Sequence, residues 1–189
     1  MALRAISDIR RQELRAAAFR VMQRAGVPGT TLERVAAEAG ASKGIVLHYF
    51  GSKDALFEQV MREANLVLAQ RVAARLAAAA TPMDRLLAVI RGNFDADLFT
   101  APICQAWLSL VAEVPRNPPL ARVQRVIHAR MRSNLLSALF PALPRDRAEA
   151  EALRLAALID GLWLREGLAP GGLSPDVAMA LVESTLPAL

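Results

Sequence analysis

Residues 30–50 constrain the fold of this chain more than any other stretch. Thr31 can cap a short helix, because its hydroxyl accepts hydrogen bonds from the free N–H groups of a first turn. Gly40 then tolerates the positive φ at which such a helix stops. Ser42 can cap a second short helix directly afterwards. Two short helices joined by a tight turn that contains glycine form a helix-turn-helix, whose second helix enters the major groove of DNA.

The second helix of this motif is expected to turn one side inward, through Ile45 and Tyr49 with Val46 as a further inward candidate, and the other side toward DNA. Base edges are read by side chains near the start of such a helix. Lysine can donate to guanine, an aliphatic side chain can pack on the thymine methyl group, and glycine lets the backbone approach closely. The residues predicted to read bases are Ser42, Lys43, Gly44, Val46, Leu47 and His48.

Three residues around the second helix suit contacts to the phosphate backbone, namely Thr31, Tyr49 and Lys53. The free N–H groups at a helix N-terminus already favour an anion. A purely structural interpretation stands beside each role, since Thr31 caps its helix with or without DNA and Tyr49 can belong wholly to the core. Arg4, Arg10 and Arg11 are either an N-terminal arm for DNA or a solvated helix end.

The positive charge of the chain is concentrated around this motif. Residues 1–53 contain nine Lys or Arg side chains and four acidic ones, a surplus that equals the formal net charge of +5 of the whole chain. A basic segment that coincides with a helix-turn-helix is the electrostatic signature of a phosphate-binding surface. The sequence therefore predicts that double-stranded DNA is a partner.

Prolines and glycines divide the rest of the sequence into apolar segments of helical period, without the alternation typical of strands. We predict an all-α fold of about nine helices. Residues 1–52 would form a helix-turn-helix domain that binds DNA, and residues 53–189 a second domain. Besides the two short helices, the predicted segments are 7–25, 53–80, 83–98, 101–114, 119–139, 145–168 and 175–185.

Several other classes of protein are disfavoured by composition. Cys104 is the only cysteine and there are two histidines, so neither a disulfide nor a structural zinc site is expected. No Gly-x-Ser-x-Gly motif is present and Cys104 has no histidine nearby, which argues against an enzyme. No apolar run reaches the roughly 18 residues of a membrane span, and the Arg-rich N-terminus does not look like a secretory signal. We expect a cytoplasmic protein without a cofactor or a metal.

Residues 31–57 resemble the DNA-binding head of the TetR family of transcriptional repressors. Tyr49-Phe50 is followed by a small turn, by Lys53-Asp54 and by an apolar helix, a continuation that generic helix-turn-helix proteins lack. The resemblance implies an N-terminal three-helix head and a six-helix body that binds a small molecule and forms a dimer.

Three segments of the body, 92–95, 106–108 and 156–165, are similar to choline-responsive repressors of that family. This similarity implies choline or a related quaternary ammonium as effector, a cation held by aromatic faces with an acid nearby. The candidate ligand-binding residues are Phe94, Asp95, Trp107, Asp160 and Trp163. The alternatives are a TetR-type regulator with a different, more hydrophobic ligand and, for each aromatic residue, ordinary core packing.

Within the predicted helix 145–168, residues 148–168 are apolar around almost the full circumference, so we expect this helix to be buried on more than one side. We predict that it forms a homodimer together with residues 175–186. An internal core helix is the alternative. In a two-fold dimer, ligand binding would change the spacing of the two reading helices and lower the affinity for DNA. An activator or a sequence-tolerant DNA binder would show the same dependence on salt and differ in specificity.

Overall fold

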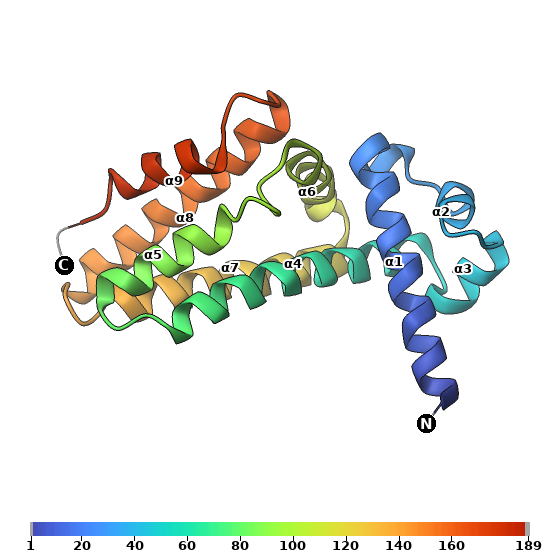
Figure 1. Cartoon of the computed structure of the whole chain (residues 1–189), viewed down its shortest axis with the longest axis horizontal. Coiled ribbons are helices and arrows are strands. Elements are labelled where there is room, and N and C mark those ends of the chain that lie inside the picture. The colour runs from blue at the N-terminus through green and yellow to red at the C-terminus, as the bar shows by residue number, and fades with distance from the viewer. Residues whose placement is uncertain (1, 188–189) are drawn as a thin grey trace. The chain divides into compact units, whose positions relative to one another are not determined.

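A computed structural model describes the backbone of residues 2–187 and the side chains of residues 6–187. Within these residues it contains nine α-helices, one 3-10 helix and no strand, which confirms the all-α prediction (Figure 1). No helix in this part of the chain is both long enough and apolar enough to cross a bilayer. The elements are α1 (Ala2–Gly29), α2 (Leu32–Glu38), α3 (Lys43–Phe50), α4 (Lys53–Ala77), α5 (Pro82–Asn93), α6 (Ala101–Glu113), η1 (Val114–Arg116), α7 (Pro118–Leu139), α8 (Arg145–Leu168) and α9 (Pro175–Glu183).

The predicted caps define where the short helices begin. Thr31 Oγ1 accepts from the backbone N–H of Arg34 at 3.2 Å, and Ser42 Oγ accepts from that of Ile45 at 3.3 Å. Gly40 adopts a φ of 58° between the two helices, a conformation that glycine reaches without strain. The turn predicted from the sequence is therefore present in the structure.

Several helix boundaries differ from the prediction, most of them by one to three residues. Helix α1 begins at Ala2 rather than at residue 7, because Ala, Leu and Arg at its start favour a helix. It extends to Gly29 rather than residue 25, with a kink at Gly26, where φ is 63°. Helix α5 ends at Asn93 rather than at residue 98. Beyond it the Asp95 carboxylate accepts from the backbone N–H of Asp97 at 3.2 Å, a local bond that stabilises a turn instead of a helix.

The chain forms two compact units, which consist of residues 1–64 with 105–124 and of residues 65–104 with 125–189. Helix α4 runs through both of them. The first unit includes residues 53–64 at the start of α4, where Glu63 pairs with Arg15 of α1 at 3.4 Å. Within the first unit, the N–H of Val27 donates to Ser109 Oγ at 2.6 Å and so joins α6 to the end of α1.

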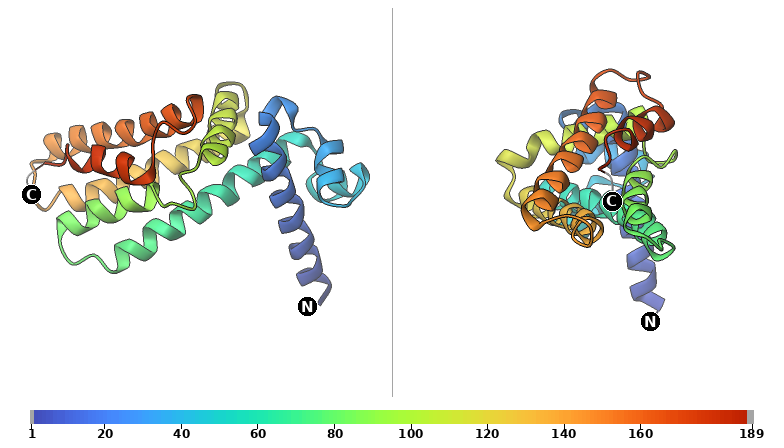
Figure 2. Two further views of the ribbon diagram at one scale, coloured as in Figure 1. Left: turned by 45° about the horizontal axis from the view of Figure 1, so that its top comes forward. Right: turned by 90° about the vertical axis from the view of Figure 1, so that its left-hand side faces the viewer.

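The core of the first unit lies under helices α1 to α3. Apolar side chains of α1 are fully buried there, among them Leu14 and Met22, and α3 contributes Val46 and Phe50. The core of the second unit collects apolar side chains from α4, α5, α7, α8 and α9. Figure 2 shows α9 lying along α8, and Arg91 of α5 pairs with Glu183 of α9 at 3.3 Å. Each unit therefore has an apolar centre of its own.

Gly92 of α5 lies directly against Val72 of α4. A Cβ atom at this position would be 2.5 Å from Val72 Cγ2 and 3.0 Å from Val72 Cα. We expect Gly92→Ala to lower the free energy of unfolding by about 2 kcal/mol, since the backbone of α4 must shift and overpacking costs about 1–3 kcal/mol. Urea denaturation would measure the loss. Gly44→Ala is the matched control, because a Cβ there meets only Ser42 Oγ at 3.7 Å. Equal stabilities of the two variants would contradict the prediction.

Candidate functional site

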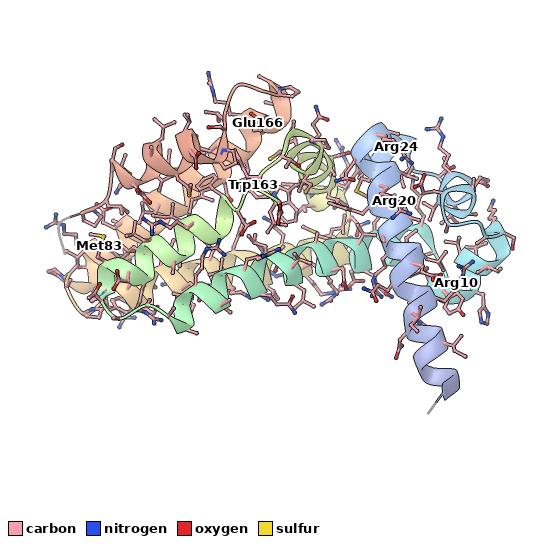
Figure 3. All side chains as sticks on the ribbon, in the orientation of Figure 1. Arg10, Arg20, Arg24, Met83, Trp163 and Glu166 are labelled. Carbon is pink, nitrogen blue, oxygen red and sulfur yellow. The ribbon has the colours of Figure 1, made fainter. Side chains whose placement is uncertain are left out.

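The first helix of the motif, α2, is fixed on α1 by a shared carboxylate. Glu38 accepts from Arg20 Nε at 2.7 Å and also from Arg24, and both arginines lie along α1 in Figure 3. The hydrogen bonds from Arg20 and Arg24 hold the pKa of Glu38 below its usual value. Such exposed pairs add little stability, but three side chains together fix the orientation of α2.

The second helix of the motif, α3, has a sharply divided surface. Val46 is 0% exposed and packs with Phe50 one turn later, so the expectation that Val46 faces a DNA groove is withdrawn. Ile45, predicted to point inward, is exposed instead. The reason is the register: the pair at positions 46 and 50 defines the buried face, which rotates position 45 outward. The exposed residues of the predicted reading set are Ser42, Lys43, Gly44, Leu47 and His48.

Lys43 is the one cation of the predicted reading set. Its Nζ atom lies 2.6 Å from the carboxylate of Glu33 in the first turn of α2, and the side chain remains half exposed. The hydrogen bond from Lys43 lowers the pKa of Glu33. An exposed pair of this kind is weak. The ammonium group is therefore held at the surface of α3 without being removed from solvent.

The ring of Tyr49 lies beneath the side chain of Arg11, for which the sequence left two roles open. The guanidinium of Arg11 is 5.6 Å from the centre of the Tyr49 ring, and the His48 ring packs edge-on at 5.3 Å. Arg10 instead pairs with Glu13 at 2.6 Å on α1, and the side chain of Arg4 lies outside the described residues. Only the packing of α1 over α3 distinguishes Arg11 from its neighbour.

The other predicted phosphate contacts lie at helix starts. Thr31 is exposed at the cap of α2, while Lys53 begins α4 with its Nζ 5.1 Å from the centre of the Phe57 ring. A helix N-terminus offers free N–H groups to a phosphate. The exposed caps and cations of α2, α3 and α4 therefore combine the features that a DNA backbone requires.

The second unit contains a row of aromatic rings. Phe94 meets Phe99 at 5.0 Å between ring centres, and Phe99 meets Trp163 at 5.6 Å, both edge to face. Trp163 Nε1 donates to the backbone oxygen of Asn93 at 3.2 Å. Two predicted ligand-binding residues, Phe94 and Trp163, are thus joined through Phe99. Trp107 belongs to the first unit and is half-buried there.

The two predicted ligand-binding acids, Asp95 and Asp160, differ in burial and in their partners. Asp95 is nearly buried, and its carboxylate accepts from Arg75 of α4 at 2.9 Å, so its charge is already compensated. Asp160 is exposed on α8, with a carboxylate oxygen 3.8 Å from His128 Nε2. Of the predicted ligand-binding residues, Phe94 and Trp163 therefore lie in one aromatic cluster, while Asp95 is paired with Arg75 and Asp160 is exposed.

A buried acid that the prediction missed follows Trp163 by one turn of α8. Glu166 is 3% exposed, and its carboxylate accepts from the backbone N–H groups of Gly171 at 2.8 Å and Leu173 at 3.0 Å. Burial, together with the negative charge of Glu166, raises the pKa of Cys104 to about 12. A glutamate one turn after a tryptophan in an apolar helix is the sequence signal that could have identified it.

Helix α8 has an exposed apolar stripe opposite its buried face. Leu153 is 73% exposed and Leu168 is 69% exposed, with Leu164 and Gly161 between them on the same side. The neighbouring helix α9 exposes Val177 and Leu181 in the same way. Large aliphatic side chains gathered in this way mark a surface for association. We call this set of exposed residues the apolar stripe: Leu153, Gly161, Leu164 and Leu168 of α8 with Val177 and Leu181 of α9.

Two protein families match this chain. The family described as "Bacterial regulatory proteins, tetR family" matches residues 14–60, and "BetI-type transcriptional repressor, C-terminal" matches residues 82–189. A curated relative from Burkholderia cenocepacia, the HTH-type transcriptional regulator BetI, is 44% identical over 92% of this chain and 90% of its own length. The regulator of the same name from Burkholderia pseudomallei strain 668 is 45% identical over the same shares.

Solved structures show the same architecture. A transcriptional regulator from Rhodococcus sp. Rha1 aligns with a TM-score of 0.83 at 25% identity, covering 92% of each chain. A protein from Saccharomonospora viridis, solved in complex with choline, aligns with a TM-score of 0.77 at 22% identity and covers 92% of this chain and 93% of its own. The second similarity concerns the fold alone.

Proposed function

This chain belongs to the TetR family of bacterial regulatory proteins, as a transcriptional repressor of BetI type rather than an enzyme, and we propose that it acts as a homodimer on a palindromic operator. The observation that supports operator binding most directly is the divided surface of α3. A helix with a buried face at Val46 and polar or small residues on the other side suits insertion into a major groove.

The proposed roles of the head follow the chemistry of its exposed residues. Lys43 donates to a guanine edge, Leu47 packs on a thymine methyl group, and Gly44 lets the backbone come close. Phosphates are contacted by Thr31, Tyr49 and Lys53, with Arg11 positioned beside the Tyr49 ring to strengthen the field. Residues 1–52 thus read DNA in the cytoplasm, and residues 53–189 bind the effector and form the dimer.

Dimerisation through α8 and α9 is supported by the apolar stripe. A single reading helix contacts only a few base pairs, so specificity requires two heads at a fixed spacing. An interface between identical chains places the same surface on both sides of a two-fold axis. The stripe fits this role, because Gly161 at its centre adds no side chain that would keep a partner helix away.

We propose choline or a related quaternary ammonium as the effector. The family assignment of residues 82–189 supports this proposal, and the aromatic row of Phe94, Phe99 and Trp163 provides suitable chemistry. Helix α4 is continuous from Lys53 near the motif to Ala77 in the second unit, and Arg75 ties it to Asp95 beside the row. A ligand that rearranges this row would therefore act on α4.

The effector proposal predicts that choline weakens operator binding. A ligand can shift the equilibrium only by the ratio of its affinities for the two states, and allosteric couplings are typically about 5- to 150-fold. We expect the dissociation constant of the operator complex, measured by fluorescence anisotropy, to rise within that range at millimolar choline. Sodium chloride at equal ionic strength controls for screening of phosphate contacts. Equal binding in both salts would reject choline and favour a more hydrophobic effector.

A further inference from the structure

We infer that Glu166 supplies the negative charge that selects a cationic effector over a neutral one, in a site whose aromatic side is formed by Phe99 and Trp163. This inference rests on the proposed binding of a quaternary ammonium and identifies a residue that would decide its specificity. It replaces Asp95 and Asp160 in that role.

Glu166 is distinguished from the other acids by its burial and by its partners. It is the only buried Asp or Glu among the described residues, and none of the ion pairs between described side chains includes its carboxylate. Its carboxylate accepts hydrogen bonds from two neutral backbone N–H groups, those of Gly171 and Leu173. A buried carboxylate that lacks a cation attracts a positive ligand strongly, because the surroundings screen it weakly.

The position of the carboxylate relative to the aromatic rings supports the same role. Residues three apart in a helix share a face, so Trp163 and Glu166 are presented on one side of α8, where Figure 3 labels both. Residues around the start of α6 lie near this part of α8. Phe99 packs against the ring of Trp163 at 5.6 Å between ring centres, and the pKa of Cys104, in the first turn of α6, is raised by burial and also by the charge of Glu166.

Helix α8 therefore presents the Trp163 ring and the Glu166 carboxylate on one face, one turn apart. A quaternary ammonium requires this combination, because it cannot donate a hydrogen bond and is bound by ring faces and a nearby negative charge. The hydrogen bonds from Gly171 and Leu173 hold the carboxylate in place, so a cation need not order it on binding.

Glu166 also anchors the loop between α8 and α9 through its hydrogen bonds, so the test must distinguish this structural role from ligand selection. We propose calorimetric titrations with choline and with 3,3-dimethyl-1-butanol, its uncharged carbon analogue. The wild-type protein is expected to prefer choline by roughly 30-fold or more, the order expected for one buried charge at close range. Glu166→Gln is expected to remove most of that preference and to change the affinity for the neutral alcohol less than about threefold.

Two further variants complete the test. Glu166→Asp keeps the charge on a shorter side chain and is expected to retain a preference for choline. Asp146→Asn removes an exposed acid from the first turn of the same helix and should bind like wild type. If Glu166→Gln weakens both ligands equally, or keeps the preference, Glu166 only anchors the loop and the inference is wrong. A wild-type protein that does not prefer choline would instead reject the proposed effector, and the inference with it.

Discussion

Replacing Leu164 with glutamate is expected to convert the dimer into monomers and to weaken operator binding by roughly 100-fold or more, because two carboxylates would be buried without partners in an apolar interface. Leu164 lies in the middle of the apolar stripe and is exposed in a single chain. Its substitution therefore leaves the core of each protomer intact. Analytical ultracentrifugation would measure the mass, and fluorescence anisotropy the affinity for the operator.

The control for this experiment is the same substitution at an exposed leucine elsewhere. Leu66 on α4 is exposed to a similar extent but lies outside the stripe, so Leu66→Glu should remain dimeric. Gly161→Leu adds a second test, because a Cβ at that position has no atom within 4 Å in one chain. It should preserve folding and still prevent the partner helix from approaching. A Leu164→Glu protein that stays dimeric would show that the interface lies elsewhere.

The second large effect is expected at the base-reading surface. Lys43→Ala should raise the dissociation constant of the operator complex by at least roughly 30-fold, because each base contact contributes about 1–3 kcal/mol and a dimer contains two copies. Binding to unrelated DNA should weaken much less, since phosphate contacts dominate it. Anisotropy titrations with operator and scrambled DNA at the same salt concentration give the specificity ratio directly.

Two variants test whether Lys43 acts on DNA rather than through its own ion pair. Glu33→Gln breaks the pair with Lys43 but leaves the ammonium group free, so operator affinity should be retained or increased. Arg24→Ala removes an exposed cation of α1 that pairs with Glu38, and it should cost less than about threefold in a region screened by solvent. Equal losses for Lys43→Ala and Arg24→Ala would mean that the reading face is misplaced.

The local structure of the head could be predicted well from sequence. Thr31 and Ser42 cap helices because hydroxyl groups satisfy nearby N–H donors, and Gly40 occupies the positive φ that the turn requires. These effects act over a few residues, so the pattern alone contains them. The distinction between Ile45 and Val46 could not be obtained in that way, since both are β-branched and adjacent. It depends on which of them meets α1 and α2.

In the candidate effector site, even less could be predicted from local sequence patterns. Phe94 and Trp163 were candidates from the sequence, yet only the fold shows that the ring of Phe99 packs against both of them. Asp95 was a reasonable acid until its pairing with Arg75 was known, because that partner lies on another helix. Nothing in the sequence showed that Glu166 is buried while the other acids of α8 are not, because burial depends on the fold.

The sequence by itself determined the all-α class, the helix-turn-helix, the concentration of positive charge in residues 1–53 and the family. Helix periodicity, caps and glycine turns depend on neighbouring residues, so they can be predicted from the sequence alone. Only the tertiary structure decided which face of α3 is exposed, which acids are compensated and which leucines of α8 remain uncovered. Burial and charge compensation depend on side chains that are distant in sequence, and a single chain read in order does not contain their distances.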